Sequence, residues 1–382
     1  MGAKKFFIIA GENSGDLHGS NLVRALRELD PDAQFFGLGG EQMKSVGVEL
    51  LRNIVKDLAI IGFTEAIAKL PKIRRLRNET IAWLKRERPD GVILIDYPGF
   101  NFIIMKAAKE LGIPVFYYIC PQFWAWREHR KYELRDNTAK IIVVLPFEES
   151  ALRETGADAT YVGHPLLDIM NLTMTREEVF GHFGFDPKKR LIGIIPGSRK
   201  SEVDALLPVM LEAAERVSEA MPDVQFTLPR ATTIRGDLIK SILARYNIPV
   251  KIVDEYRYNV RSCLDFAWVK SGTATLETAL LGTPMLIVYK VSWLSWMLAK
   301  SIVKVPFISL VNLIANDLVV PELLQNEATA QNIAERTLRF YDRPEEQERM
   351  TYQLAKIREK MGGPGASARA AKIIHDYLQS HE

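Results

Sequence analysis

Short apolar runs alternate along the chain with longer stretches in which apolar residues recur every three or four positions. Runs of this kind are typical of strands buried on both faces, and the longer stretches are typical of amphipathic helices. The pattern therefore predicts a parallel β-sheet covered by helices on both faces. In the first half the expected strands are Lys5–Ala10, Gln34–Leu38, Gly91–Asp96, Pro114–Ile119 and Lys140–Leu145.

A second series of strands follows a break in the pattern around Gly163–Pro165 and a polar stretch at 186–189. Its members are expected at Arg190–Ile195, Val224–Leu228, Val250–Val253, Leu264–Val269 and Met285–Tyr289. A length of 382 residues also favours two domains. We expect two Rossmann-like α/β domains facing one another across a cleft, residues 1–165 and 166–344. The helices of residues 345–382 are expected to return to the first domain.

Composition and charge narrow the class of protein. The chain is 47% hydrophobic and 25% charged, as in ordinary globular proteins, and a formal net charge of +3 is too small to indicate nucleic-acid binding. Cys120 and Cys263 lie in apolar runs, as expected of reduced cysteines in a cytoplasmic protein. No signal peptide and no transmembrane span are expected, because the most apolar stretch, 291–314, is interrupted by two lysines and a proline.

Loops at the carboxyl ends of the strands are the expected ligand sites of an open α/β sheet. The loop Gly11–Asp16 lacks the P-loop ending and the dinucleotide glycine spacing, so it is either a tight turn or a cradle for an anion or sugar hydroxyls. In Pro196–Glu202, a glycine, Ser198 and Arg199 precede a helix. This combination favours phosphate binding, since arginine and a helix N-terminus both attract phosphate.

A second anion-binding helix start is expected in SGTATLETALLGTPML, residues 271–286. It begins with four small residues, Ser271, Gly272, Thr273 and Ala274. Glu277, one turn inside, could accept both hydroxyls of a ribose, although a carboxylate that serves the helix dipole would sit there as well. Two such loops on one sheet edge together predict a site for a nucleoside diphosphate.

Asp96 ends an otherwise apolar strand within IDYPGFN. A carboxylate in this setting is costly unless it is solvated or paired, and such settings tune general bases. A turn-capping aspartate is the alternative. No metal is expected, because the six histidines are scattered and the one Asp-x-Asp, at 30–32, follows a predicted helix.

Ten blocks of the sequence resemble, in order, the lipid-A-disaccharide synthase family. They are GENSGDLHG, FFGLGG, IDYPGFN, CPQFWAWR, LPFE, VGHPLLD, IPGSRKSEV, SGTATLETALLGTPM, SLVNLIAND and VPELLQ, and they span about residues 6–326. The resemblance implies a GT-B glycosyltransferase that inverts the anomeric carbon without a metal or a cofactor. The implied reaction transfers 2,3-diacylglucosamine from UDP-2,3-diacylglucosamine to 2,3-diacylglucosamine 1-phosphate. It releases UDP, in lipid A and lipopolysaccharide biosynthesis.

The resemblance also implies roles for single residues. Asp96 matches the catalytic base, and Ser14 matches an essential serine. The implied donor-binding residues are Ser198, Arg199, Ser271, Gly272, Thr273, Ala274 and Glu277, with Asn312 and Gln325 nearby. The chain departs from the family pattern at Lys270, where a small residue is expected, and at Asn316-Asp317, where a glycine and a basic residue are expected.

Lipid substrates imply that the protein works at a membrane surface. The segment 58–77 interleaves apolar with basic residues, so it is either an ordinary core helix or an interfacial element. Its expected apolar contacts are Ile60, Ile61 and Phe63, with Trp124 and Trp126 expected near the acceptor or the membrane. We expect peripheral association with the cytoplasmic face of the inner membrane. A homodimer is also compatible with the sequence.

Two other functions stay open at this point. UDP-N-acetylglucosamine 2-epimerases share the two-lobed architecture and a similar donor loop. A non-catalytic nucleotide-sugar sensor would give Asp96 no chemical role.

Overall fold

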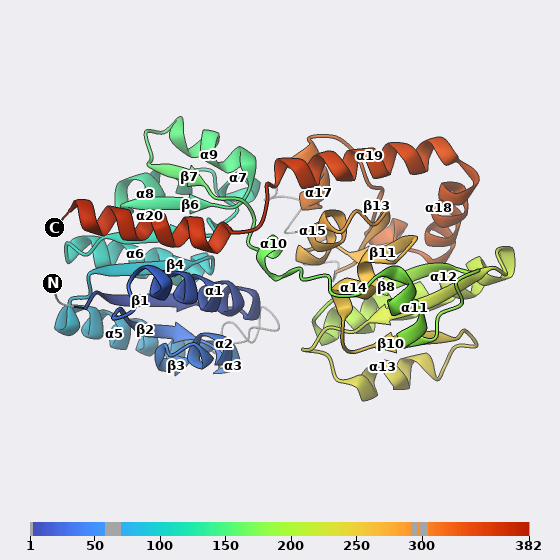
Figure 1. The fold of residues 1–382 in the computed structure, drawn as a ribbon, viewed down its shortest axis with the longest axis horizontal. Coiled ribbons are helices and arrows are strands. Elements are labelled where there is room, and N and C mark those ends of the chain that lie inside the picture. The colour runs from blue at the N-terminus through green and yellow to red at the C-terminus, as the bar shows by residue number, and fades with distance from the viewer. Residues whose placement is uncertain (1–2, 58–69, 292–295, 298–304, 382) are drawn as a thin grey trace. The chain divides into compact units, whose positions relative to one another are not determined.

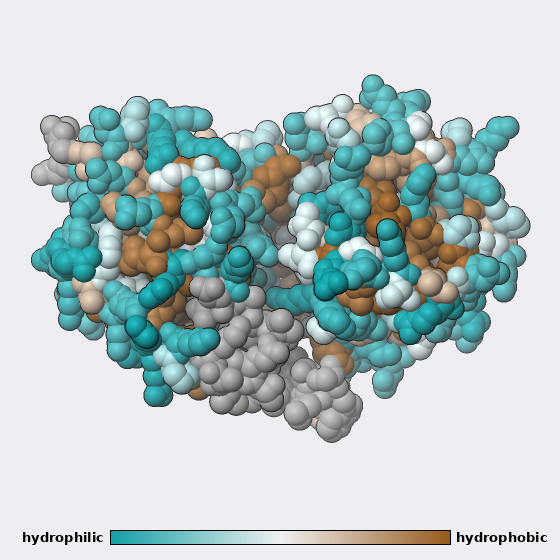
Figure 2. Space-filling view, turned by 90° about the horizontal axis from the view of Figure 1, so that it is seen from below, coloured by the Kyte–Doolittle hydropathy of each residue, from teal (hydrophilic) through white to brown (hydrophobic). Residues whose placement is uncertain are grey.

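The computed structural model describes residues 3–57, 70–291, 296–297 and 305–381. The chain forms two compact units (Figure 1): unit 1 is Met1–Asp168 with Gly363–Glu382, and unit 2 is Ile169–Gly362. Each unit contains one parallel β-sheet with its helices. Hydrophilic residues cover most of the face seen in Figure 2, and hydrophobic residues gather in smaller patches on each unit. None of the described helices combines the length and the apolar character needed to cross a membrane.

In the described part of unit 1 the sheet has seven strands, in the order β3-β2-β1-β4-β5-β6-β7. The strands are β1 (Lys5–Ala10), β2 (Gln34–Gly39), β3 (Glu49–Asn53), β4 (Gly91–Ile95), β5 (Val115–Tyr118), β6 (Lys140–Val143) and β7 (Ala159–Tyr161). Every residue of β4 and β5 is buried, which explains their nearly continuous apolar sequences.

The helices of unit 1 pack on this sheet and on one another. They are α1 (Asn13–Leu29), α2 (Glu41–Ser45), α3 (Ile54–Asp57), α5 (Leu70–Glu87), α6 (Pro98–Glu110), α7 (Phe123–Trp126), α8 (Arg130–Asn137), α9 (Pro146–Arg153), α10 (Leu166–Ile169) and α20 (Ala366–Ser380). The C-terminal helix α20, red in Figure 1, packs along α1. The carboxylate of Asp168 accepts hydrogen bonds from the N–H groups of Gly365, Ala366 and Ser367 at 2.6, 3.2 and 2.9 Å, so it anchors the start of α20.

In the described part of unit 2 the sheet has six strands, in the order β10-β9-β8-β11-β12-β13. The strands are β8 (Arg190–Ile195), β9 (Val224–Pro229), β10 (Val250–Val253), β11 (Phe266–Lys270), β12 (Met285–Tyr289) and β13 (Glu322–Leu324). The helices are α11 (Arg176–Phe183), α12 (Lys200–Ala220), α13 (Gly236–Leu243), α14 (Arg257–Ser262), α15 (Thr273–Leu280), α17 (Leu310–Ala315), a 3₁₀ turn at Gln325–Glu327, α18 (Ala330–Asp342) and α19 (Pro344–Lys360).

The C-terminal return to unit 1 is shorter than the sequence led us to expect. Residues 345–382 were expected there, but only Gly363–Glu382 belongs to unit 1. Helix α19 packs instead on α15, α17 and α18 of unit 2. The reason is an apolar stripe on α19, formed by the buried Met350, Leu354 and Ile357.

Candidate functional site

Both sheets reverse their strand order at one point. In unit 1 the reversal lies between β1 and β4, and in unit 2 it lies between β8 and β11. In open α/β sheets ligands bind beyond the carboxyl ends of the strands at such a point. Ser14 and Asp96 follow β1 and β4, whereas Arg199 and Ser271 follow β8 and β11. The structure thus brings the main expected site residues to the switch point of each sheet.

The turn after β1 is fixed by Asp16, which the sequence did not single out. Asp16 is 2% exposed, and its Oδ1 accepts hydrogen bonds from the N–H groups of Gly40 (2.7 Å) and Met43 (3.1 Å). Its Oδ2 accepts from the N–H of Gln42 at 2.9 Å. A Cβ at position 40 would lie 2.5 Å from Asp16 Oδ2, so the glycines before α2 permit this close packing rather than the approach of a nucleotide. Ser14, in the first turn of α1, is exposed.

The turn after β4 holds Asp96 in an unusual backbone conformation. Asp96 and Tyr97 have φ values of 44° and 46°, in the left-handed region that residues with a side chain rarely adopt. The Asp96 carbonyl accepts hydrogen bonds from Asn101 Nδ2 at 2.8 Å and from Tyr117 Oη at 2.7 Å, and both donors are buried. A Cβ at Gly11 would lie 2.2–2.5 Å from the Tyr97 ring, so this turn packs directly on the one after β1. Surroundings of this kind are what let strained residues persist at functional sites.

The carboxyl group of Asp96 has the electrostatics of a general base. Its side chain keeps access to solvent. Desolvation by the surrounding protein nevertheless raises its pKa to about 6, and the negative charge of Glu12 adds to this, although a hydrogen bond from the Tyr97 backbone acts in the opposite direction. A carboxylate of this pKa is ionised at neutral pH and is a stronger base than an ordinary aspartate.

A second carboxyl group of unit 1, Glu148, was missed from the sequence. It is 1% exposed, and it accepts hydrogen bonds from Trp124 Nε1 (3.0 Å) and from the Leu145 N–H (3.2 Å). Burial raises its pKa to about 7, against these hydrogen bonds, and the charge of Asp96 adds to the rise. The signal in the sequence was an acid inside the apolar block LPFE, but its partner Trp124 is 24 residues away.

Of the two tryptophans expected near the acceptor or the membrane, only Trp124 has a described side chain. Trp124 is half-buried and packs edge-on against Phe147, with ring centroids 5.2 Å apart. The side chain of Trp126 lies outside the described part of the structure, as do Ile60, Ile61 and Phe63.

In unit 2 a single carboxylate connects the starts of α12 and α15. Glu202 Oε2 accepts hydrogen bonds from the N–H groups of Ser198 and Arg199, at 3.0 and 3.2 Å. Its Oε1 lies 2.8 Å from the ammonium of Lys270, the last residue of β11. Burial acts to raise the pKa of Glu202, but the hydrogen bond and charge of Lys270 outweigh it and lower that pKa overall. Lys270, where the chain departs from the family pattern, therefore joins the two expected anion-binding loops through its ion pair with Glu202.

The start of α15 is shaped by Gly272, whose φ of 149° strains any residue with a side chain. Ser271 is buried and donates its N–H to the Val288 carbonyl at 3.2 Å. Gly272 and Thr273 are exposed and Ala274 is half-buried. Since β8 and β11 are neighbouring parallel strands, the exposed starts of α12 and α15 lie on the same sheet edge. This arrangement can receive an anion from two helix N-termini.

Glu277 is already paired in the structure. It accepts hydrogen bonds from Arg261 Nη1 and from Tyr258 Oη, the latter at 3.2 Å. Glu277 and Arg261 side chains are 17% and 8% exposed. A carboxylate has about four acceptor positions, so Glu277 can still accept a hydrogen bond from a ribose hydroxyl. The pairing with Arg261 and Tyr258 fixes the orientation of the Glu277 carboxylate.

The expectation that Asn312 contacts the donor is not supported, because its side chain is saturated by protein groups. Its Nδ2 donates to Val320 O (2.9 Å) and Glu322 Oε1 (2.8 Å), and its Oδ1 accepts from the N–H groups of Val319 and Val320 at 2.9 and 3.0 Å. It is fully buried and shapes the loop between α17 and β13. Gln325 is half-buried and pairs with both backbone groups of Val291, at 2.8 and 3.1 Å.

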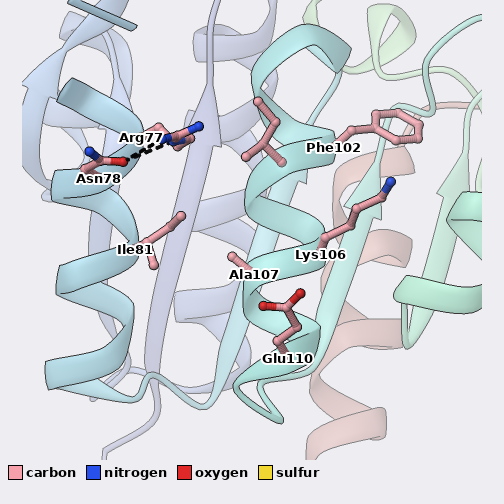
Figure 3. A pocket seen from close by; sticks show the side chains of 8 residues that line it. Arg77, Asn78, Ile81, Phe102, Lys106, Ala107 and Glu110 are labelled. Atoms are coloured by element: carbon pink, nitrogen blue, oxygen red, sulfur yellow. Dashed lines mark hydrogen bonds between the residues drawn. The ribbon is translucent and has the colours of Figure 1, made fainter. Parts of the chain in front are cut away.

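The described residues also form a cavity that lies apart from these loops. A shallow cavity of about 390 Å³ between α5 and α6 (Figure 3) is lined by Arg77, Asn78, Ile81, Phe102, Ile103, Lys106, Ala107 and Glu110. None of the expected site residues lines it. No group of three or more His, Cys, Asp and Glu in the described ranges could hold a metal ion.

Comparison with known proteins gives one consistent family. The family model described as "Lipid-A-disaccharide synthetase" matches residues 6–373. The chain is 42% identical over 372 residues to a lipid-A-disaccharide synthase of Syntrophus aciditrophicus, covering 97% of each chain. It is 40% identical over 375 residues to that of Geobacter metallireducens, covering 98% of this chain and 97% of the relative.

Similar solved structures support the fold alone, because their sequence identity is low. A putative UDP-N-acetylglucosamine 2-epimerase from Listeria monocytogenes has a TM-score of 0.66 at 15% identity, covering 100% of this chain and 97% of that one. MurG from Acinetobacter baumannii has a TM-score of 0.60 at 15% identity, covering 98% and 99%. The two-domain, GT-B-like fold expected from the sequence is thereby confirmed.

Proposed function

The chain belongs to the lipid-A-disaccharide synthase family of glycosyltransferases, and we propose how its residues divide the transfer between the two units. The donor is UDP-2,3-diacylglucosamine, bound by unit 2, and the acceptor is 2,3-diacylglucosamine 1-phosphate, received by unit 1. The observation that carries this division is Asp96, a carboxyl of raised pKa held in a strained turn at the switch point of unit 1.

The transfer is a single displacement at the anomeric carbon of the donor. The acceptor's 6-hydroxyl oxygen attacks C1 from the face opposite UDP, and Asp96 takes its proton. As the new β(1→6) bond forms, the bond between C1 and the β-phosphate oxygen breaks, and its electron pair stays on UDP. Arg199 and the starts of α12 and α15 stabilise the negative charge on the departing diphosphate. Glu277 holds the ribose.

The other functions left open by the sequence have less support. The likeness to 2-epimerases is one of fold at 15% identity, whereas the family match extends over nearly the whole chain. A nucleotide-sugar sensor would not need a base with the pKa of Asp96.

The pH dependence of the rate tests Asp96 as the base. Because the base must be ionised, kcat/KM is expected to fall about tenfold per pH unit below a midpoint near pH 6, the pKa of Asp96. Glu12→Gln removes a negative charge that helps raise this pKa, so the midpoint should move to lower pH. Glu28→Gln, at an exposed position of α1, is the matched control and should leave the midpoint in place. An acid limb unmoved by Glu12→Gln would argue against this base.

We also propose that the chain binds the cytoplasmic face of the inner membrane, since both substrates carry acyl chains. The first turns of α5 present the exposed cations Lys72, Arg74 and Arg75, beside an exposed Leu70. Each cation near an anionic surface contributes about 1 kcal/mol. Ile60, Ile61 and Phe63, in the segment before α5, would supply apolar contacts.

Vesicle sedimentation tests this membrane contact. We expect co-sedimentation with vesicles containing anionic phospholipid at low salt and release at high salt, because salt screens the attraction. Replacing Lys72 and Arg74 with serine should weaken binding several-fold, whereas the same change at Lys356 and Arg358, exposed on α19, should not. The triple change of Ile60, Ile61 and Phe63 to serine should also weaken it. Equal binding by all variants would contradict the proposed surface.

A further inference from the structure

Lys270 places a positive charge between the two helix starts of unit 2. Its side chain is 19% exposed, and its Nζ lies 2.8 Å from Glu202 Oε1. The same Nζ lies 3.5 Å from where a Cβ at Gly272 would stand, at the start of α15. It also lies 5.7 Å from the centroid of the Tyr289 ring. The ammonium is therefore held at the carboxyl edge of β11, where β11 adjoins β8.

Glu202 is tethered in this arrangement, and Lys270 retains hydrogen-bonding capacity. Glu202 Oε2 is occupied by the N–H groups of Ser198 and Arg199, and the guanidinium of Arg199 lies 3.9 Å from Oε1. One carboxylate thus faces two cations and the positive ends of two helices, so the group stays positive overall. An ammonium has three N–H donors. Glu202 uses one of them, so others can reach a second anion.

We propose that Lys270 is a catalytic residue of the transfer, and that its ammonium, held by Glu202, donates hydrogen bonds to the β-phosphate oxygens of UDP. This assignment rests on the proposed function. When the bond between the donor C1 and the β-phosphate oxygen breaks, the electron pair passes to that oxygen. Lys270 keeps its proton and stabilises the charge, while the proton of the acceptor hydroxyl goes to Asp96. Glu202 is then a positioning residue, because it acts through Lys270.

A structural latch is the competing account of the same contacts. In that account Lys270 and Glu202 only join the loops after β8 and β11, and removal of the ammonium would disturb the whole donor site. UDP and UMP would then lose affinity alike. A direct contact with the β-phosphate predicts instead that UDP loses affinity and UMP, which lacks that phosphate, does not.

The test compares Lys270→Met with Lys270→Arg in the full-length protein. Methionine keeps much of the length and apolar stem of lysine without its charge. By titration calorimetry, Lys270→Met is expected to raise the Kd for UDP about tenfold and to change that for UMP less than about twofold. The kcat for disaccharide formation should fall about tenfold, since Arg199 and the helix starts remain. Lys270→Arg should recover part of both losses.

Lys251→Met, on β10 of the same unit, is the matched control and should leave UDP affinity and kcat unchanged. Parallel losses for UDP and UMP, or wild-type UDP affinity and kcat in Lys270→Met, would overturn the assignment and leave the proposed function in place. Failure of the wild-type protein to form disaccharide would overturn the proposed function itself, and this assignment with it.

Discussion

Asp96→Asn is expected to lower kcat by about 10²–10⁴-fold while leaving the Kd for UDP within about twofold. A positioned base contributes roughly 10²–10⁴-fold to a rate, and asparagine cannot take the acceptor's proton at neutral pH. The turn should persist, because its main hydrogen bonds run to the backbone carbonyl of residue 96, from Asn101 and Tyr117. UDP binding should persist because the proposed donor site lies in unit 2.

The measurement pairs a UDP-release assay for kcat with calorimetry for UDP affinity. Asp136→Asn, at an exposed position of α8, is the control and should behave as wild type in both. If Asp96→Asn lost UDP binding and kcat fell only in proportion to that loss, Asp96 would be a donor-site residue. The assignment of Asp96 as the general base would then be wrong.

Arg199→Ala is expected to lower kcat by about 10²–10³-fold and to weaken UDP binding by about tenfold. Removal of one preorganised donor to a developing charge has effects of this size. Its side chain is 58% exposed and its guanidinium lies 3.9 Å from Glu202 Oε1, so the fold should lose no more than about 0.5 kcal/mol. Arg199→Lys should recover only part of the rate, because lysine cannot bind phosphate bidentately.

Arg235 provides a matched control for this variant. It stands at the same N-cap position of α13 in the same unit, and its side chain is 84% exposed. Arg235→Ala should leave kcat and UDP affinity unchanged. For both variants, thermal unfolding should show little change in stability. Equal kinetic losses in the two variants would mean that a general reduction of charge, rather than a diphosphate contact, explains the effect.

The sequence predicted the strands that have a run of apolar residues. All ten expected strands are present, and four have the expected bounds: β1 (Lys5–Ala10), β8 (Arg190–Ile195), β10 (Val250–Val253) and β12 (Met285–Tyr289). Among the described residues three strands were missed, β3 (ELLRN), β7 (ATY) and β13 (ELL), and each lies at the edge of its sheet. These three strands are short and partly exposed, so their sequences need not be apolar and give little signal. The edge strand β10 was predicted because three of its four residues, VKIV, are apolar.

The sequence offers candidate site residues where a residue type is informative by itself, but it does not show contacts that depend on a distant partner. Arg199 and Gly272 stand in loops whose composition indicates an anion-binding helix start. In contrast, Asp16 resembles any first-turn acid until its carboxylate meets the N–H groups of α2, 24–27 residues later. The pairing of Glu202 with Lys270 is equally invisible in the sequence, because adjacency of β8 and β11 creates it.

Product analysis of one reaction tests the central claim most directly. The purified protein is incubated with UDP-2,3-diacylglucosamine and 2,3-diacylglucosamine 1-phosphate in detergent, and UDP and lipid products are quantified by mass spectrometry. The account predicts equal amounts of UDP and of a tetraacylated disaccharide 1-phosphate, joined by a β(1→6) bond that nuclear magnetic resonance identifies. Failure to form disaccharide from these substrates, together with epimerisation of plain UDP-N-acetylglucosamine, would contradict it.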